Sequence, residues 1–171
     1  MGLAPTTSTT LMLALGDALA VSLLERKGFS ADDFRVFHPG GKLGRRLMRV
    51  ADIMHGGERM PLLGPATPMM DAILEMTSKS LGCVGIVDAH RRLCGIITDG
   101  DIRRHIADAN LLRRTAGEVM NLTVKTIPAD ALASEALQIM NAKSITALFV
   151  VEDGRPVGIL HIHDCLRAGV A

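Results

Sequence analysis

The chain contains no tryptophan and no tyrosine, and only four phenylalanines. Proteins that bind single-stranded nucleic acid stack the bases on aromatic rings, and this chain has few rings to offer. Basic and acidic residues nearly cancel, 19 against 18, so there is no global electrostatic attraction for a polyanion. The composition therefore predicts no nucleic-acid partner.

Long uninterrupted apolar runs are also lacking. The longest, at 11–24, is broken by Gly16, Asp17 and Ser22 and falls short of the roughly 18–20 residues that span a bilayer. It also lacks the charged start and the cleavage pattern of a signal peptide. We therefore expect a soluble, cytoplasmic protein with no membrane partner.

Cysteine is scarce, and its spacing is uninformative. Cys83, Cys94 and Cys165 form an odd set without a CxxC pair, and the first two lie in apolar runs. Cysteines of this kind are typically small core residues in a reducing compartment, so the pattern favours packing over a redox or metal role.

The most informative feature that is present is an internal repeat. Residues 68–104 align with 132–167 once one residue is removed from the first hairpin, and "ADIM" at 51–54 aligns with "GEVM" at 117–120. The paired positions include Ile73 with Leu137, Met76 with Met140, Lys79 with Lys143, Ser80 with Ser144, Gly95 with Gly158 and Asp101 with Asp164. Two copies of one unit therefore occupy 51–171.

Each copy has the same local pattern, which predicts a helix, two strands and a second helix. In the first copy Met69, Met70, Ile73, Leu74 and Met76 predict one apolar helical face. The expected strands are 83–88, 93–98, 147–152 and 156–161, joined by polar turns, and the second helices are 101–109 and 163–168. Because a small sheet cannot bury one face alone, we expect an α/β (α+β) fold in which the copies pack together.

Residues 1–50 lie outside the repeat. The hydroxyl-rich "TTSTT" followed by an apolar segment predicts a helix that starts at these caps and ends before Gly28. Ser30 and Asp33 have the spacing of a capping box, and a glycine-rich loop with basic residues follows. This segment is too short to form a domain, so we expect it to be part of a larger fold.

The sequence "GIITDGD" at 95–101 carries the candidate site of the first copy. A strand ending in Thr98, followed by Asp99 and by Asp101 at a helix start, directs a hydroxyl, N–H groups and a carboxylate to one place. Such groups suit a phosphate and paired sugar hydroxyls. The alternative is that Thr98 and Asp101 only cap the helix. Catalysis by two acids so close in sequence is disfavoured, because paired carboxylates normally oppose each other across a substrate.

The second copy has "GILHIHD" at the equivalent place, so His161 replaces the threonine and Asp164 recurs. His161 and His163 share a strand face and could line a pocket with imidazole, pack between the copies, or hold a metal; the expectation is no metal. Met54 and Met120, which end the two lead-ins, are candidates for bordering a ligand pocket. Lys79 and Lys143 are candidates for an anionic ligand.

The motif Gly95-Ile-Ile-Thr98-Asp-Gly-Asp101 and its repeat resemble the cystathionine-β-synthase (CBS) domain. Two such domains in tandem form a Bateman module that senses nucleotides. The lead-in "APTTSTTLMLALGDALAVSLLERKGFSADDFRVFHPGGKLGRRL", with "ADIMHGGERMP" and "GILHIHD", resembles the D-arabinose 5-phosphate isomerase family, in which a sugar isomerase (SIS) domain precedes a CBS pair. The resemblance covers nearly the whole chain.

This resemblance implies three segments: the end of an SIS domain at 1–50, CBS domain 1 at 51–112 and CBS domain 2 at 113–171. The parent enzyme would interconvert D-ribulose 5-phosphate and D-arabinose 5-phosphate for Kdo and lipopolysaccharide synthesis, without a catalytic cofactor. His38, in "HPGG", matches a histidine of the family's active site. The other catalytic residues belong to an upstream region, so we expect these 171 residues to be inactive.

The resemblance also implies a ligand and an oligomer. The expected regulatory ligand is a nucleotide or nucleotide sugar, with CMP-Kdo as the favoured candidate. Adenine nucleotides (AMP or ATP) remain an alternative, as does a purely structural module that binds nothing. His161 departs from the usual threonine and counts against ATP or AMP at the second site. A homodimer of CBS pairs is expected, within a tetramer of the parent.

Overall fold

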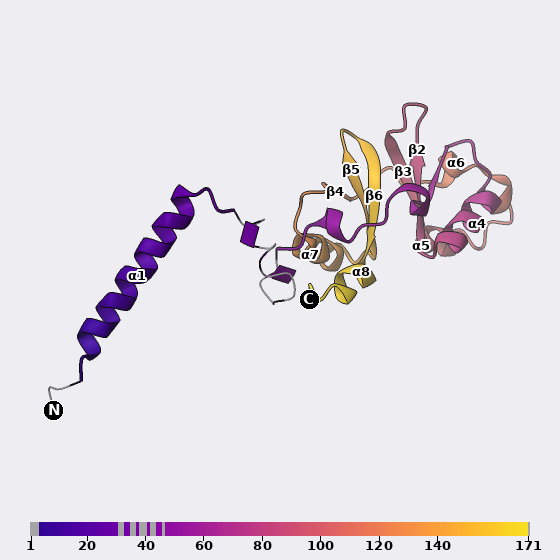
Figure 1. Ribbon diagram of the computed structural model, residues 1–171. Coiled ribbons are helices and arrows are strands. Elements are labelled where there is room, and N and C mark those ends of the chain that lie inside the picture. The colour runs from indigo at the N-terminus through magenta and orange to yellow at the C-terminus, as the bar shows by residue number, and fades with distance from the viewer. Residues whose placement is uncertain are drawn as a thin grey trace. The chain divides into compact units, whose positions relative to one another are not determined.

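The structure is a computed structural model that describes residues 4–30, 33–34, 37, 41, 44–45 and 47–170. The chain divides into two compact units, Met1–Leu47 and Met48–Ala171. The repeat lies within the second unit, so each unit is described by itself (Figure 1).

The first unit contains one long helix, α1 (Thr6–Arg26), which has no buried residue. The expected end is confirmed, because Gly28 follows with a positive φ of 64°. The expected start is wrong: Pro5 is the N-cap, and the hydroxyl run lies inside the helix, where Ser8 and Thr9 donate to the Pro5 carbonyl. The capping box of Ser30 and Asp33 is confirmed by reciprocal hydrogen bonds of 2.8 and 3.2 Å.

Helix α1 also corrects the expectation that polar residues interrupt the apolar run. It continues through Gly16, Asp17 and Ser22 and is long and apolar enough to cross a membrane. Length and composition alone are weak grounds for a membrane role, because a core helix of a soluble domain meets the same requirements. The leucines of α1 are exposed in this unit.

The second unit contains two small sheets, one for each copy (Figure 1). The first copy comprises β1 (Leu62–Leu63), α4 (Met69–Lys79), β2 (Cys83–Val87), β3 (Leu93–Thr98) and α5 (Asp99–Arg104). The second comprises β4 (Thr126–Ile127), α7 (Ala133–Lys143), β5 (Ala147–Glu152), β6 (Arg155–His161) and α8 (Ile162–Arg167). The predicted α/β class and hairpins are confirmed.

Some details of the two copies differ from expectation. The two-residue strands β1 and β4, which pair in parallel with β2 and β5, were not predicted. Helix α5 ends at Arg104 instead of 109. The second hairpin turns at Asp153 and Gly154, whose φ angles of 50° and 79° are those of a type I′ turn.

The long helices bury a narrower face than their sequences indicate. Helix α4 buries Met69, Ala72 and Met76, whereas Met70 and Leu74 are exposed, which corrects the predicted apolar face. In α7 the equivalent buried residues are Ala133, Ala136 and Met140. Three residues at i, i+3 and i+7 are enough to cover one side of a three-stranded sheet.

The lead-in segments exchange between the copies. They contain η1 (Val50–Asp52) and η2 (Gly57–Arg59) in the first copy, and η3 (Leu111–Arg113) and α6 (Ala116–Val119) in the second. His55 pairs with Ile159 of β6, and Asn121 pairs with Ile96 of β3. Each lead-in therefore extends the sheet of the other copy.

The copies also share a core, as expected from their small sheets. Leu81 and Cys83 from the first copy pack with Phe149 and Ile159 from the second, and Phe149 is fully buried. Exchange of lead-ins and a common core make the repeat one body, so the loops of one copy can line a site with the motif of the other.

Candidate functional site

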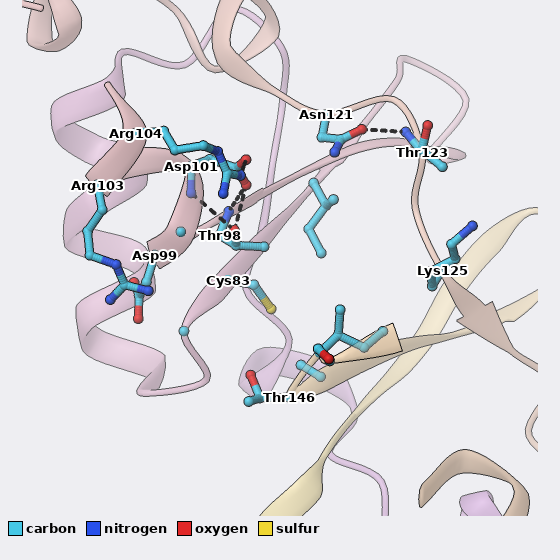
Figure 2. Close-up of a pocket in the computed structure, with 16 residues that line it drawn as sticks. Cys83, Thr98, Asp99, Asp101, Arg103, Arg104, Asn121, Thr123, Lys125 and Thr146 are labelled. Atoms are coloured by element: carbon cyan, nitrogen blue, oxygen red, sulfur yellow. Dashed lines mark hydrogen bonds and ion pairs between the residues drawn. The ribbon is translucent and has the colours of Figure 1, made fainter. Parts of the chain in front are cut away.

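A cavity of about 510 Å³ lies beside the first motif, a volume within the usual range for small-molecule sites. Thr98, Asp99 and Asp101 form one wall, at the junction of β3 and α5. The second copy supplies the opposite wall. The polar side chains around the cavity are those of Thr98, Asp99, Asp101, Arg103, Arg104, Asn121, Thr123, Lys125, Ser144 and Thr146 (Figure 2).

Asp101 is held by its own motif. Its Oδ2 accepts hydrogen bonds from the Thr98 amide at 2.8 Å and from the Thr98 hydroxyl at 2.6 Å. These bonds complete a capping box at the start of α5. Its Oδ1 accepts from Arg104, whose side chain is 67% exposed (Figure 2). Oδ2 therefore serves the fold, whereas Oδ1 is bound to a solvated and replaceable partner.

The charge state of Asp101 follows from these contacts. Burial alone would raise its pKa, but the hydrogen bonds from Thr98 and the Arg104 guanidinium outweigh burial and hold the pKa below its ordinary value of 3.8. The group is therefore an anion at neutral pH. It can accept hydrogen bonds from hydroxyls, but it has no proton to donate as a general acid.

Asp99 behaves differently from Asp101. It is exposed, and its carboxylate lies next to Gly82 at the rim of the cavity. It adds to the effect of burial on Cys83, whose thiol pKa is raised to about 12. The thiol is consequently a neutral packing group, and it confirms the prediction for this cysteine.

The second motif has the same acid but different neighbours. The Oδ2 of Asp164 accepts from the His161 amide at 3.1 Å and contacts Nε2 of His55 at 2.9 Å, while Oδ1 accepts from Arg167 at 2.6 Å. Burial would raise the pKa of Asp164, but these donors hold it below its ordinary value. The Arg167 side chain is 74% exposed, so the pairing of each acid with an exposed arginine recurs.

The histidines of the second motif stand close together. The rings of His161 and His163 lie with centroids 5.0 Å apart, and Nδ1 of His161 accepts from the His163 amide at 3.3 Å. Burial, followed by the proximity of His163, lowers the pKa of His161 and favours its neutral form. Within the described residues, no three His, Cys, Asp or Glu side chains are placed to hold a metal ion.

Comparison with known proteins identifies the fold. The family model described as "CBS domain" matches residues 50–108 and 116–171. The chain belongs to the CBS-domain family. The two copies are thus a CBS pair, as the glycine–threonine–aspartate motif predicted.

Two relatives and two solved structures define the similarity further. Arabinose 5-phosphate isomerase KdsD of Pseudomonas aeruginosa is 51% identical over 173 residues, which cover 99% of this chain and 53% of the relative. The Yersinia pestis protein of the same name is 47% identical, with 99% and 52% covered. The chain spans about half the length of these curated relatives.

Among solved structures, a putative acetoin utilization protein (AcuB) from Vibrio cholerae is 25% identical, with a TM-score of 0.65 and coverage of 72% and 91%. The CBS domain pair of protein MJ0100, solved with 5′-methylthioadenosine and S-adenosyl-L-methionine, is 29% identical, with a TM-score of 0.63 and coverage of 71% and 94%.

The remaining predicted site residues lie apart from the acids. Met120 packs over Gly95 and Met54 over Gly158. Neither methionine lines the cavities of about 510, 380 and 350 Å³ that the described residues form. Lys79 lines a cavity of about 380 Å³, where its Nζ donates to the Glu58 carbonyl at 2.6 Å.

Lys143 is exposed and does not line the cavities of about 510, 380 and 350 Å³. His38, predicted from the family resemblance, lies outside the described residues.

Sequence reasoning missed several residues that line the site. Arg104 and Arg167 each follow their aspartate by three residues, so the repeat alignment held a signal for them. His55 and Asn121, which follow the paired methionines, also occupy equivalent positions. Lys125 and Thr146 gave no local signal, because they reach the first motif only through the packing of the two copies.

Proposed function

We propose that this chain is the regulatory CBS pair of an arabinose 5-phosphate isomerase and that it senses a nucleotide or nucleotide sugar. In this proposal residues 1–50 are the end of an SIS domain, and 51–112 and 113–171 are the two CBS domains. The near-complete match to the KdsD relatives supports the parent enzyme. The adenosine ligands of the MJ0100 pair support a nucleotide.

One observation carries the binding proposal: an ionised carboxylate, Asp101, lines a cavity of about 510 Å³ and offers Oδ1 to an exposed arginine. We propose that the hydroxyl pair of a ribose replaces Arg104 at this oxygen. The released guanidinium, with Arg103 and Lys125, would face the phosphate. A hydrogen bond to a charged group contributes about 1.5–3 kcal/mol, enough to select a sugar.

CMP-Kdo is our first candidate among the possible ligands. It combines a cytidine ribose with a phosphate and a carboxylate, and the three cationic side chains Arg103, Arg104 and Lys125 around the first cavity are suited to two anionic groups. AMP and ATP are the alternatives. The parent enzyme would then be regulated by a product of its own pathway or by the adenylate pool.

The same proposal covers location and assembly. A cytoplasmic enzyme would contain α1 in the core of its SIS domain. Two CBS pairs would associate as a homodimer within a tetrameric parent, and the exposed Met70 and Leu74 on α4 provide apolar surface for such contact.

Calorimetric titration tests the proposal. CMP-Kdo, CMP, AMP, ATP and S-adenosyl-L-methionine are each titrated into the chain and into the Asp101→Asn variant. We expect at least one compound to bind and D101N to weaken that binding at least tenfold. Asp153→Asn is a matched control, because Asp153 is an exposed turn residue and the charge change is the same.

Two outcomes would contradict the proposal. Silence from every compound at millimolar concentration would support the purely structural module. Binding that D101N leaves unchanged would place the ligand elsewhere.

A further inference from the structure

His55 and Asn121 are equivalent residues of the two copies. Each follows a methionine that packs over a strand glycine, and each pairs with the edge strand of the other copy. His55 exchanges both backbone hydrogen bonds with Ile159, at 2.8 and 2.9 Å, and Asn121 exchanges both with Ile96, at 2.8 and 3.0 Å. The backbone is therefore the same at both places, and any difference between the sites comes from side chains.

The two side chains take different partners. The Asn121 Oδ1 accepts from the Thr123 amide of its own loop at 2.8 Å. Among the described residues, Asp101 takes its side-chain partners only from Thr98 and Arg104 of its own motif. The side chain of His55, in contrast, reaches the motif of the other copy, where its Nε2 lies 2.9 Å from Oδ2 of Asp164.

The replacement of threonine by histidine explains the difference. In the first copy the Thr98 hydroxyl supplies a proton to Oδ2 of Asp101 at 2.6 Å. His161 stands at that position in the second copy, but its Nδ1 is an acceptor for the His163 amide. Oδ2 of Asp164 therefore lacks this local side-chain donor. Asp164 is ionised and can only accept a hydrogen bond. In the contact between the two side chains, Nε2 of His55 is therefore protonated and donates to Oδ2 of Asp164.

The cavities follow the same division. The cavity of about 510 Å³ beside Asp101 is the first cleft. The second cleft, on the side of Asp164, comprises cavities of about 380 and 350 Å³, and His55 lines both. The imidazole and its bond to Asp164 thus lie where a ligand equivalent to one in the first cleft would pass.

We propose that His55 closes the second site, so that the CBS pair binds one ribonucleoside phosphate per chain, in the first cleft. This inference rests on the proposed function for the ligand class, but the closure itself does not need a ligand. A molecule that filled both spaces of the second cleft would have to displace the His55 imidazole, which lines both, as well as Arg167 at Oδ1 of Asp164, whereas a molecule in the first cleft displaces only Arg104. The pair His55 and His161 therefore determines which copy is open.

The test compares stoichiometry in calorimetric titrations with AMP and with CMP. The wild-type chain is expected to bind one molecule, and the double variant His55→Asn with His161→Thr is expected to bind two. The double variant gives the second copy the Asn and Thr of the first, so that Asp164 regains a hydroxyl donor. Adding Asp164→Asn to it should remove the second binding event and leave the first.

Binding of two nucleotide molecules per wild-type chain would overturn the proposal. Binding of only one per chain of the double variant would also overturn it, provided that the variant unfolds like the wild type. Ligand-free NMR provides an independent reading. The ring Nε2–H of His55 should be protected from exchange in the wild type and lose that protection in Asp164→Ala, which removes the acceptor.

An unprotected His55 ring in the wild type overturns the closure whether or not any nucleotide binds. Failure of every nucleotide to bind the wild type and the double variant, with the His55 ring protected, would instead contradict only the proposed function.

Discussion

Replacing Gly95 with alanine tests whether the exchanged lead-ins are packed as described. A Cβ at Gly95 would lie 2.8 Å from Cγ and 3.0 Å from Cβ of Met120, and closer still to its sulfur. Contacts below 3.0 Å do not persist, so the methionine must leave its place over β3. Overpacking of this kind costs about 1–3 kcal/mol of unfolding free energy.

The sign of the change in unfolding free energy is decisive, because alanine would stabilise the protein if it met no neighbouring atom. A glycine-to-alanine change without a clash stabilises by about 0.4–1 kcal/mol, since it restricts the unfolded chain. Gly64→Ala is the control within the same unit, because nothing lies within 4 Å of its Cβ position. Urea unfolding followed by circular dichroism measures each variant.

A double-mutant cycle isolates the clash from other effects of the change. A Met120→Ala background removes Sδ and Cγ, the two nearest atoms, so most of the cost of Gly95→Ala should be lost there, which gives a coupling energy of about 1–3 kcal/mol. Unchanged or raised stability of G95A in the wild-type background would contradict the packing of Met120 over Gly95. An equal cost in both backgrounds would show that Met120 is not the obstacle.

Four further predictions concern the core, the acids, the thiol and activity. Phe149→Ala should lower the free energy of unfolding by about 3–5 kcal/mol in urea titration, because Phe149 is fully buried between the copies; a loss below 1 kcal/mol would contradict this. The lowered pKa of Asp101 means that its contribution to stability is complete above its ordinary value of 3.8 and is lost as the pH falls through the lower folded value. The free energy of unfolding, measured by urea titration at a series of acidic pH values, should therefore fall less steeply with pH for Asp101→Asn than for the wild type. Parallel pH profiles of the two proteins would contradict this. With a pKa of about 12, Cys83 should resist a thiol reagent at neutral pH until the protein unfolds, and rapid native labelling, detected by mass spectrometry, would count against the burial described. The 171-residue chain should not isomerise D-ribulose 5-phosphate, and measurable turnover would disprove that expectation.

The duplicated pattern was enough to predict the fold, because periodicity reports local structure. The strands around Gly95 and Gly158 and the turn at Asp153 follow from short-range preferences, and both hairpins formed as expected. The exchange of lead-ins could not be predicted. It depends on pairings such as His55 with Ile159, which join residues about a hundred positions apart.

The candidate site was partly visible in the sequence. The repeat located Asp101 and Asp164, and both lie on cavity walls. Each acid also caps its helix, so the capping interpretation is confirmed and ligand binding stays a prediction. The space that Gly95 and Gly158 leave beside their strands is occupied by the side chains of Met120 and Met54. The contact of His55 with Asp164 was not predicted, because neither the residue types nor their local spacing indicates a partner so distant in the chain.

Recognition of a ribose by Asp101 is tested most directly by comparing a ribonucleotide with its 2′-deoxy analogue. If the Asp101 carboxylate holds the hydroxyl pair of a pentose, removal of one hydroxyl forfeits a charge-assisted hydrogen bond of about 1.5–3 kcal/mol. The deoxy compound should then bind roughly 10- to 150-fold more weakly, as measured by calorimetry with AMP against dAMP and CMP against dCMP. Equal affinities within each pair would contradict the account.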